Sequence, residues 1–264
     1  MQQGEAQAGR TVSGTYVYCV MPTALAPTES TALGPSIDAS APLRTVREDG
    51  LTALVSDALR PEYDPSRANI GAHERIVRAA YERGDVLPMR FGTVAPDDGS
   101  VETFLRQKHD DLAKVLEQLH DRAELALKVS WVDGDAILKE ILMEDEGIRQ
   151  QRAEIMARPE AEAHDQRVEL GRRVTEALEQ RRQAEADRIL ERLRSKAIDV
   201  DVHNLLSETM VLNAAFLIDR DAMTPFDEEV SALGSEESGR LTVKYVGPLP
   251  PYSFVKIAIP KDQG

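Results

Sequence analysis

The amino-acid sequence predicts an α+β fold in two domains. Strand-like runs and amphipathic helical patterns alternate in both halves of the 264-residue chain, and a new strand starts near residue 123. A chain of this length commonly forms about two domains. We therefore predict an N-terminal α+β domain over residues 14–122 and a C-terminal domain over residues 123–264. Residues 1–13 are polar and are predicted to be a disordered lead-in.

Short runs rich in apolar and β-branched residues predict the strands of the first domain. Residues 15–21 (TYVYCVM) form such a run and predict a buried strand, followed by a loop over residues 22–42. Residues 43–48 and 51–56 flank an Asp-Gly pair. Because both residues of that pair can take positive φ angles, the spacing predicts a β-hairpin.

Two helices complete the first domain. Apolar residues recur at helical spacing over residues 66–84, and Gly84 occupies the usual position after a helix. Residues 101–120 carry a second amphipathic stripe. The segment between the helices, residues 85–94, is predicted as a strand.

The second domain is predicted to begin with a strand over residues 124–132, which contains the only tryptophan, Trp131. The Arg- and Glu-rich region over residues 136–196 is interrupted by Pro159, which predicts a helical hairpin. Its charged faces fit either a solvated surface or an arm that binds a partner. The remaining elements are predicted as strands at 198–202, 209–218 and 241–246 and a helix at 227–233. This order, βαββαβ with an enlarged first crossover, predicts a modified ferredoxin-like fold.

Charge and composition exclude several classes of partner. The formal net charge is −14, and because nucleic-acid binding depends on Lys and Arg neutralising phosphates, we expect no nucleic-acid partner. The same sign disfavours anionic membrane surfaces, and no window approaches the ~20 apolar residues of a membrane span. The single cysteine, Cys19, permits no intramolecular disulfide. Together these features predict a soluble, cytoplasmic protein.

No catalytic, cofactor-binding or metal-binding residue is predicted. The five histidines lack the spacing of a metal site. The glycines form no phosphate-binding loop, and no serine lies in a nucleophile elbow. Cys19 lies within an apolar run and is predicted to be a small buried side chain.

The segment at residues 86–94 (VLPMRFGTV) is the first of two informative motifs. Pro88 cannot donate a backbone hydrogen bond, so its strand is expected at a sheet edge or a bulge. Strand alternation would direct Arg90 and Phe91 to opposite faces, and Gly92 would allow a bend. Such a strand is either purely structural or an Arg-bearing edge that pairs with another chain.

The second motif lies at residues 245–255 (YVGPLPPYSFV). Its prolines favour an extended segment with few backbone donors. The segment could cover the sheet or present Tyr252 and Phe254 to a partner.

Both motifs resemble the paired signatures of the gas vesicle accessory family GvpF/GvpL. The resemblance extends to residues 15–18, to the His73-Glu74 pair and to residues 128–131, and it spans residues 15–259. Leu249 departs from the family pattern, which commonly has an aromatic residue there. These motifs do not separate GvpF from GvpL.

The resemblance implies a non-enzymatic accessory or minor structural protein of gas vesicle assembly, located at the gas vesicle. Its implied partners are the hydrophobic shell protein GvpA and other vesicle accessory proteins, and its implied fold is two α+β domains. The alternative is a ferredoxin-like small-molecule-binding protein or enzyme, because that fold hosts many functions. The candidate partner contacts are Pro88, Arg90, Phe91, Gly92, Pro250, Pro251, Tyr252 and Phe254.

Overall fold

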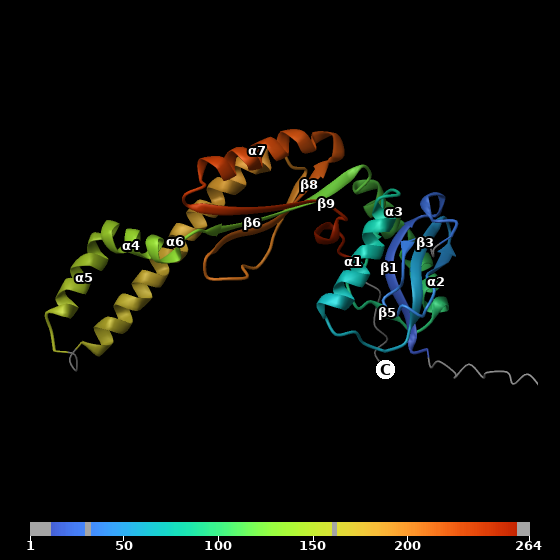
Figure 1. Ribbon diagram of the computed structural model, residues 1–264, viewed down its shortest axis with the longest axis horizontal. Helices are drawn as coiled ribbons and strands as arrows, with labels where there is room; N and C mark the ends of the chain where they lie inside the picture. Colours follow the sequence, from blue (N-terminus) through green and yellow to red (C-terminus); the bar gives the residue numbers. More distant parts are fainter. Residues whose placement is uncertain (1–11, 30–32, 160–162, 258–264) are drawn as a thin grey trace, which may run out of the picture. The chain divides into compact units, whose positions relative to one another are not determined.

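A computed structural model describes residues 12–29, 33–159 and 163–257 (Figure 1). Most of the predicted lead-in, residues 1–11, lies outside this part. The contacts divide the chain into a first unit, Met1–Glu124 with Pro248–Gly264, and a second unit, Leu125–Gly247. The residues from Pro248 onward therefore group with the first unit, whereas the sequence analysis placed them in the C-terminal domain.

The sheet of the first unit is built around strand β1. Its strands are β1 (Gly14–Pro22), β2 (Arg44–Glu48), β3 (Leu51–Ala58), β4 (Leu87–Pro88) and β5 (Val94–Ala95). The order is β2-β3-β1-β4, and β5 also pairs with β1. The predicted hairpin is confirmed: β2 and β3 are antiparallel, and Asp49 and Gly50 have φ angles of 45° and 80°. Positive φ at both turn residues matches the right-handed twist of the strands.

Helix α1 (Arg67–Tyr81) supplies the helical side of the core in this unit. It begins where the Ser66 side chain accepts a hydrogen bond from the Asn69 amide. The predicted helix at 101–120 is instead two helices, α2 (Asp98–Gln107) and α3 (His109–Gln118), because Lys108 leaves the helical region at φ −105°, ψ 11°. The same unit contains the short 3₁₀ turns η1 (Thr23–Leu25) and η5 (Tyr252–Phe254).

The second unit has a four-stranded sheet with helices packed on its core. Its strands are β6 (Arg122–Trp131), β7 (Asp199–Val202), β8 (Met210–Asp219) and β9 (Leu241–Leu249), in the order β7-β8-β6-β9. Along β6, Leu125, Leu127, Val129 and Trp131 enter the core. The same core receives residues of α6 (His164–Arg194) and α7 (Met223–Glu236), which follows the 3₁₀ turn η4 (Arg220–Ala222).

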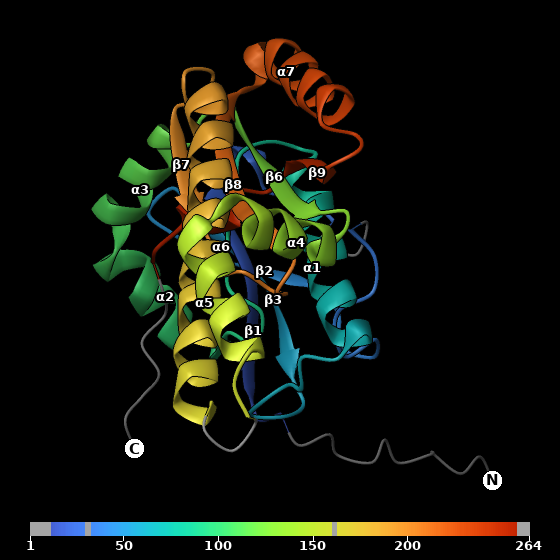
Figure 2. The ribbon, with the colours of Figure 1, turned by 90° about the vertical axis from the view of Figure 1, so that its left-hand side faces the viewer.

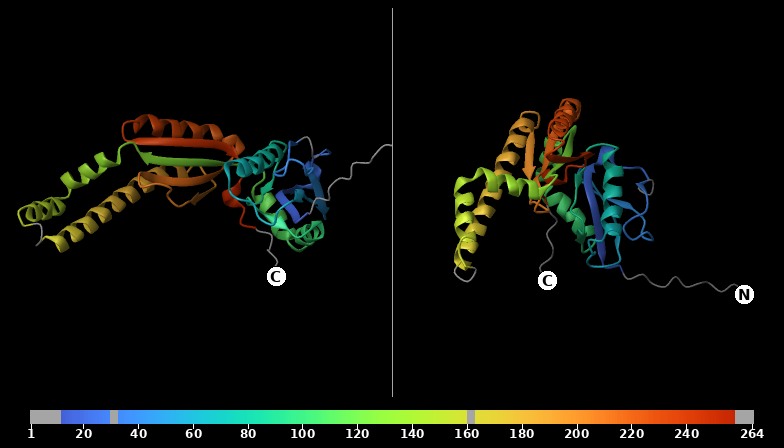
Figure 3. Two further views of the ribbon diagram at one scale, coloured as in Figure 1. Left: turned by 60° about the horizontal axis from the view of Figure 1, so that its bottom comes forward. Right: turned by 60° about the vertical axis from the view of Figure 1, so that its left-hand side comes forward.

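In residues 134–159 and 163–194, the predicted helical hairpin is made of three helices rather than two. Its first arm is divided into α4 (Gly134–Glu144) and α5 (Glu146–Met156), and α6 forms the returning arm (Figures 2 and 3). The division occurs at Asp145, which has extended φ/ψ angles and whose carboxylate accepts a hydrogen bond from the Ile148 amide. Aspartate is a preferred N-cap, so a new helix begins there. Among the described residues, no helix has both the length and the hydrophobicity needed to cross a membrane.

Candidate functional site

The first motif forms a turn between two short edge strands. Strand β4 pairs with Cys19 and Val20 of β1, and β5 pairs with Thr15 and Tyr16. The prediction of a continuous strand over residues 85–94 is therefore wrong, although Pro88 does lie at the edge of the sheet. Met89 still donates to the Tyr18 carbonyl and Thr93 still accepts from the Val17 amide, both at 2.9 Å, so the interruption of the ladder is confined to residues 90–92.

Residues 90–93 make the turn itself. The Thr93 amide donates to the Arg90 carbonyl at 3.2 Å, and Gly92 has a φ of 79°. Positive φ at the third position is the mark of a type II turn and favours glycine. Because this backbone is not extended, the predicted strand alternation of Arg90 and Phe91 does not apply.

The turn is held by a buried hydrogen-bonded chain. The Gly92 amide donates to the Tyr16 hydroxyl at 3.0 Å, and that hydroxyl lies 3.0 Å from Nδ1 of His73. On the other side of the ring, Nε2 lies 3.1 Å from the Met89 carbonyl oxygen. Because a carbonyl can only accept, Nε2 carries the proton, and Nδ1 accepts from Tyr16. His73 and Tyr16 thus fix both ends of the segment from Met89 to Gly92.

His73 is only 1% exposed. Burial lowers the pKa of His73 from 6.5 to about 4, an effect that the hydrogen bond with Met89 partly opposes. The ring is therefore neutral at pH 7, which is the form that the chain of hydrogen bonds requires.

The two motifs meet at His73. The Phe91 ring packs edge-on against the imidazole at a centroid distance of 6.0 Å, and the Tyr252 ring lies 6.2 Å from it. The Tyr16 and Tyr18 rings lie 5.8 and 5.7 Å from the same imidazole. We call these five residues the aromatic cluster. It belongs to the first unit, as does the segment that carries Tyr252.

A buried carboxylate fixes the second motif beside this cluster. Glu124 is 5% exposed, and its oxygens accept from the Ser253 amide at 2.7 Å and from the Ser253 hydroxyl at 3.0 Å. Sequence reasoning missed the roles of Glu124, Ser253 and Tyr16. The one sequence feature that could have indicated a buried, hydrogen-bonded Glu124 is its charge at the start of a predicted apolar strand.

The structure separates the candidate contact residues by exposure. Arg90 is exposed and makes no ion pair within the described part of the chain. Half-buried positions are Phe91, Gly92, Tyr252 and Phe254, and fully buried ones are Pro88, Pro250 and Pro251. The three buried prolines therefore fix the course of the backbone and are not accessible for direct contact with a partner.

Replacing Gly92 by alanine is expected to destabilise the protein by about 1–2 kcal/mol. The cause is the φ of 79°, because a residue with a Cβ is strained in this left-handed backbone conformation. A Cβ at that position would have no atom within 4 Å. The matched control is Gly71→Ala, also without Cβ contacts but inside α1, which is expected to stabilise by about 0.5–1 kcal/mol. Urea unfolding of both variants measures the difference, and equal effects at the two positions would contradict the turn assignment.

Cys19 is fully buried, as predicted, and burial raises the pKa of its thiol. Among the described residues, no group of three or more His, Cys, Asp or Glu side chains could hold a metal ion.

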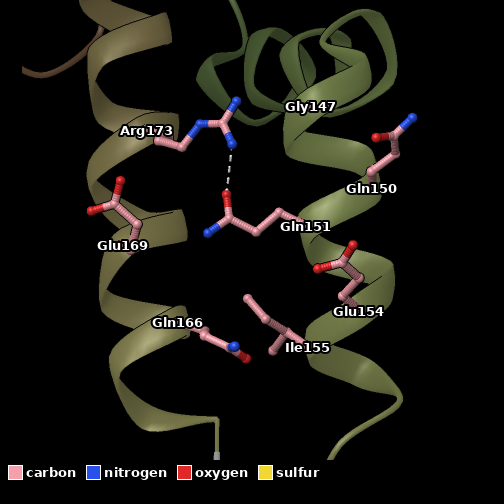
Figure 4. A pocket seen from close by; sticks show the side chains of 8 residues that line it. All are labelled: Gly147, Gln150, Gln151, Glu154, Ile155, Gln166, Glu169 and Arg173. Atoms are coloured by element: carbon pink, nitrogen blue, oxygen red, sulfur yellow. Dashed lines mark hydrogen bonds between the residues drawn. The ribbon is translucent and has the colours of Figure 1, made fainter.

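A polar groove lies between α5 and α6 in the second unit (Figure 4). It has a volume of about 400 Å³ and an amide-rich lining in which Arg173 donates to the Gln151 oxygen at 2.8 Å. The side-chain oxygen of Gln166 is buried there and has no hydrogen-bond partner in the part of the chain that the structure describes. The remaining lining residues are Gly147, Gln150, Glu154, Ile155 and Glu169.

We compared the sequence of this chain with those of known proteins. The family model described as gas vesicle synthesis protein GvpL/GvpF matches residues 14–256. Gas vesicle protein F of Streptomyces sp. (strain CB03234) is 33% identical over 243 residues, covering 92% of this chain and 99% of the relative. Gas vesicle protein L of the same strain is 31% identical over 235 residues, covering 82% and 84%.

Solved structures agree with the sequence comparison. The crystal structure of GvpF from Anabaena sp. PCC7120 is similar with a TM-score of 0.79 at 26% identity, covering 93% of this chain and 99% of that one. GvpF from Microcystis aeruginosa gives 0.76 at 25% identity, covering 93% and 100%. The resemblance carried by the two motifs is thereby confirmed: the chain belongs to the gas vesicle synthesis protein GvpL/GvpF family.

Proposed function

We propose that this chain is a non-enzymatic accessory or minor structural protein of gas vesicle assembly, acting at gas vesicles in the cytoplasm. Its proposed partners are the hydrophobic shell protein GvpA and other vesicle accessory proteins. The observation that carries the proposal is the family match over residues 14–256, which includes both motifs.

The proposed contact is the surface around the Arg90–Thr93 turn. Edge strands are natural templates for another chain, and β4 and β5 form the edge on which this turn lies. Arg90 is exposed beside them and can bind a carboxylate through two parallel hydrogen bonds. The net charge of −14 would keep a complex with an apolar partner soluble.

We also propose that the chain is organised as two domains and that the second is ferredoxin-like. The division between Glu124 and Leu125 supports a boundary near residue 123. The strand order β9-β6-β8-β7, with helices after β6 and β8, supports the ferredoxin-like assignment. On this assignment the helical hairpin enlarges the first crossover.

Catalysis is not part of the proposal. An enzyme or small-molecule site would need converging reactive groups in a pocket. The groove between α5 and α6 instead offers amides, two glutamates and Arg173, and its chemistry includes no nucleophile paired with a base.

Arg90→Ala is expected to weaken binding to the shell protein at least about fivefold, equivalent to about 1 kcal/mol, because it removes an exposed charged contact while leaving the fold intact. The measurement is a pull-down or titration with the purified shell protein. Arg47→Ala is the matched control, since Arg47 is exposed on β2 at the opposite edge of the same sheet.

The proposed surface would be excluded if both variants bound like the parent chain. Phe91→Ala is a poorer probe, because its ring packs on the aromatic cluster and its loss lowers stability as well.

A further inference from the structure

The segment Pro250–Val255, which we call the strap, is attached to the first unit mainly by side chains. Its backbone hydrogen bonds from Tyr252 to Pro250 (2.8 Å) and from Phe254 to Pro251 (3.2 Å) are internal. In the described residues, the Ser253 amide is the one strap amide that bonds outside the segment, and it donates to the Glu124 side chain. A segment held in this way can undock without breaking a sheet ladder.

The docked strap has an imperfect fit at Tyr252. Its ring packs on His73, but its hydroxyl is buried and has no hydrogen-bond partner among the described residues. Burying an unsatisfied hydroxyl opposes docking, since the group would be hydrated if the strap left. The favourable contributions come from the Glu124–Ser253 hydrogen bonds and from the buried prolines.

The strap and the proposed contact turn share one ring. Tyr252 and Phe91 both pack against the His73 imidazole. Figure 1 shows the strap, in red, beside α1, the helix that carries His73. Release of the strap would therefore expose apolar surface directly next to Phe91.

We propose that the strap is an internal ligand that competes with the partner for this surface. The site it fills accepts a short apolar turn together with an N–H and O–H donor pair for Glu124. In the partner-bound state, an apolar segment of the hydrophobic shell protein takes the place of the strap. This inference rests on the proposed function, because the shell protein is the partner named there.

Ser253→Ala tests the proposal, with Ser235→Ala as the control. Ser235 is an exposed serine whose hydroxyl donates to the backbone carbonyl of Ser231 within α7. Loss of the hydroxyl bond to the Glu124 carboxylate is expected to accelerate amide exchange at residues 252–256 about tenfold, while exchange in β1 stays unchanged. The same variant is expected to bind the shell protein about three- to tenfold more tightly, because a larger fraction of chains has an open site.

A synthetic peptide covering residues 248–257 separates competition from general loosening. Added in excess, it is expected to return the affinity of the Ser253→Ala chain to the parent value. Faster strap exchange without tighter binding would overturn the inference, as would strap exchange that occurs only with unfolding of β1. If Arg90→Ala also leaves binding unchanged, the proposed contact itself fails, whereas an effect of Arg90→Ala alone would reject only the strap mechanism.

Discussion

Lowering the pH from 7 to 4 is expected to destabilise the first unit by about 3 kcal/mol through His73 alone. The pKa of this residue is about 4 in the folded chain and 6.5 in the unfolded chain. Between these values the unfolded state binds a proton that the folded state does not, so stability falls as the pH drops below 6.5 and is fully present above it. At about 1.4 kcal/mol per pH unit, the difference amounts to about 3 kcal/mol.

The measurement is urea unfolding at several pH values, followed by near-ultraviolet circular dichroism of the tyrosines. Tyr16 and Tyr18 lie against His73 and report on its surroundings. His73→Gln removes the titrating group and should flatten the profile above pH 4. Asp98, whose pKa Arg44 lowers from 3.8, loses its stabilisation only at lower pH. A variant profile as steep as that of the parent would show that His73 does not cause the loss.

Glu185→Ala is expected to destabilise the second unit by about 3 kcal/mol. Glu185 is 8% exposed in α6 and accepts from the Trp131 indole nitrogen and from Nε of Arg240, the latter at 2.7 Å. Its removal leaves the indole N–H without this partner and weakens the pairing of a partly buried guanidinium. Arg240 keeps its two hydrogen bonds to Glu140, at 2.9 and 2.8 Å, which limits the loss.

Trp131 makes this prediction convenient to test, because it is the only tryptophan in the chain. Its fluorescence during urea unfolding reports directly on the affected cluster. Glu191→Ala, at an exposed position of the same helix, is the control. Glu185→Gln should recover part of the stability, because an amide oxygen can still accept one of the two bonds. Equal stabilities of the Glu185→Ala and Glu191→Ala chains would rule out a stabilising role for Glu185.

The elements predicted correctly from sequence are those with strong local signals. The Asp49-Gly50 turn specifies its hairpin because both residues adopt positive φ. The alternation in β6 places Leu125, Leu127 and Val129 in the core and leaves Lys128 exposed. These features depend on neighbours in sequence, so a single sequence reveals them.

The candidate site depended on contacts that sequence does not display. The glycine in the first motif indicated a bend, but only the bonds from the Gly92 amide to Tyr16 and from the His73 ring to the Met89 carbonyl show that the strand is interrupted. Likewise, nothing in the prolines of the second motif indicated that Glu124 would hold Ser253. Both arrangements are set by tertiary packing between distant segments, which overrides the extended pattern of the local sequence.

The chain leaves the first unit after Glu124 and returns to it at Pro248. The two parts of the first unit are therefore synthesised at different times. A ribosome translates all of Leu125–Gly247 before it reaches Tyr252, the strap residue that packs on His73. Until then, the nascent first unit carries an imidazole and a Phe91 ring without their covering segment, together with a Glu124 carboxylate that lacks Ser253. Apolar surface exposed during translation favours association with other chains or with chaperones. The first unit therefore completes its packing only after the second unit has been synthesised.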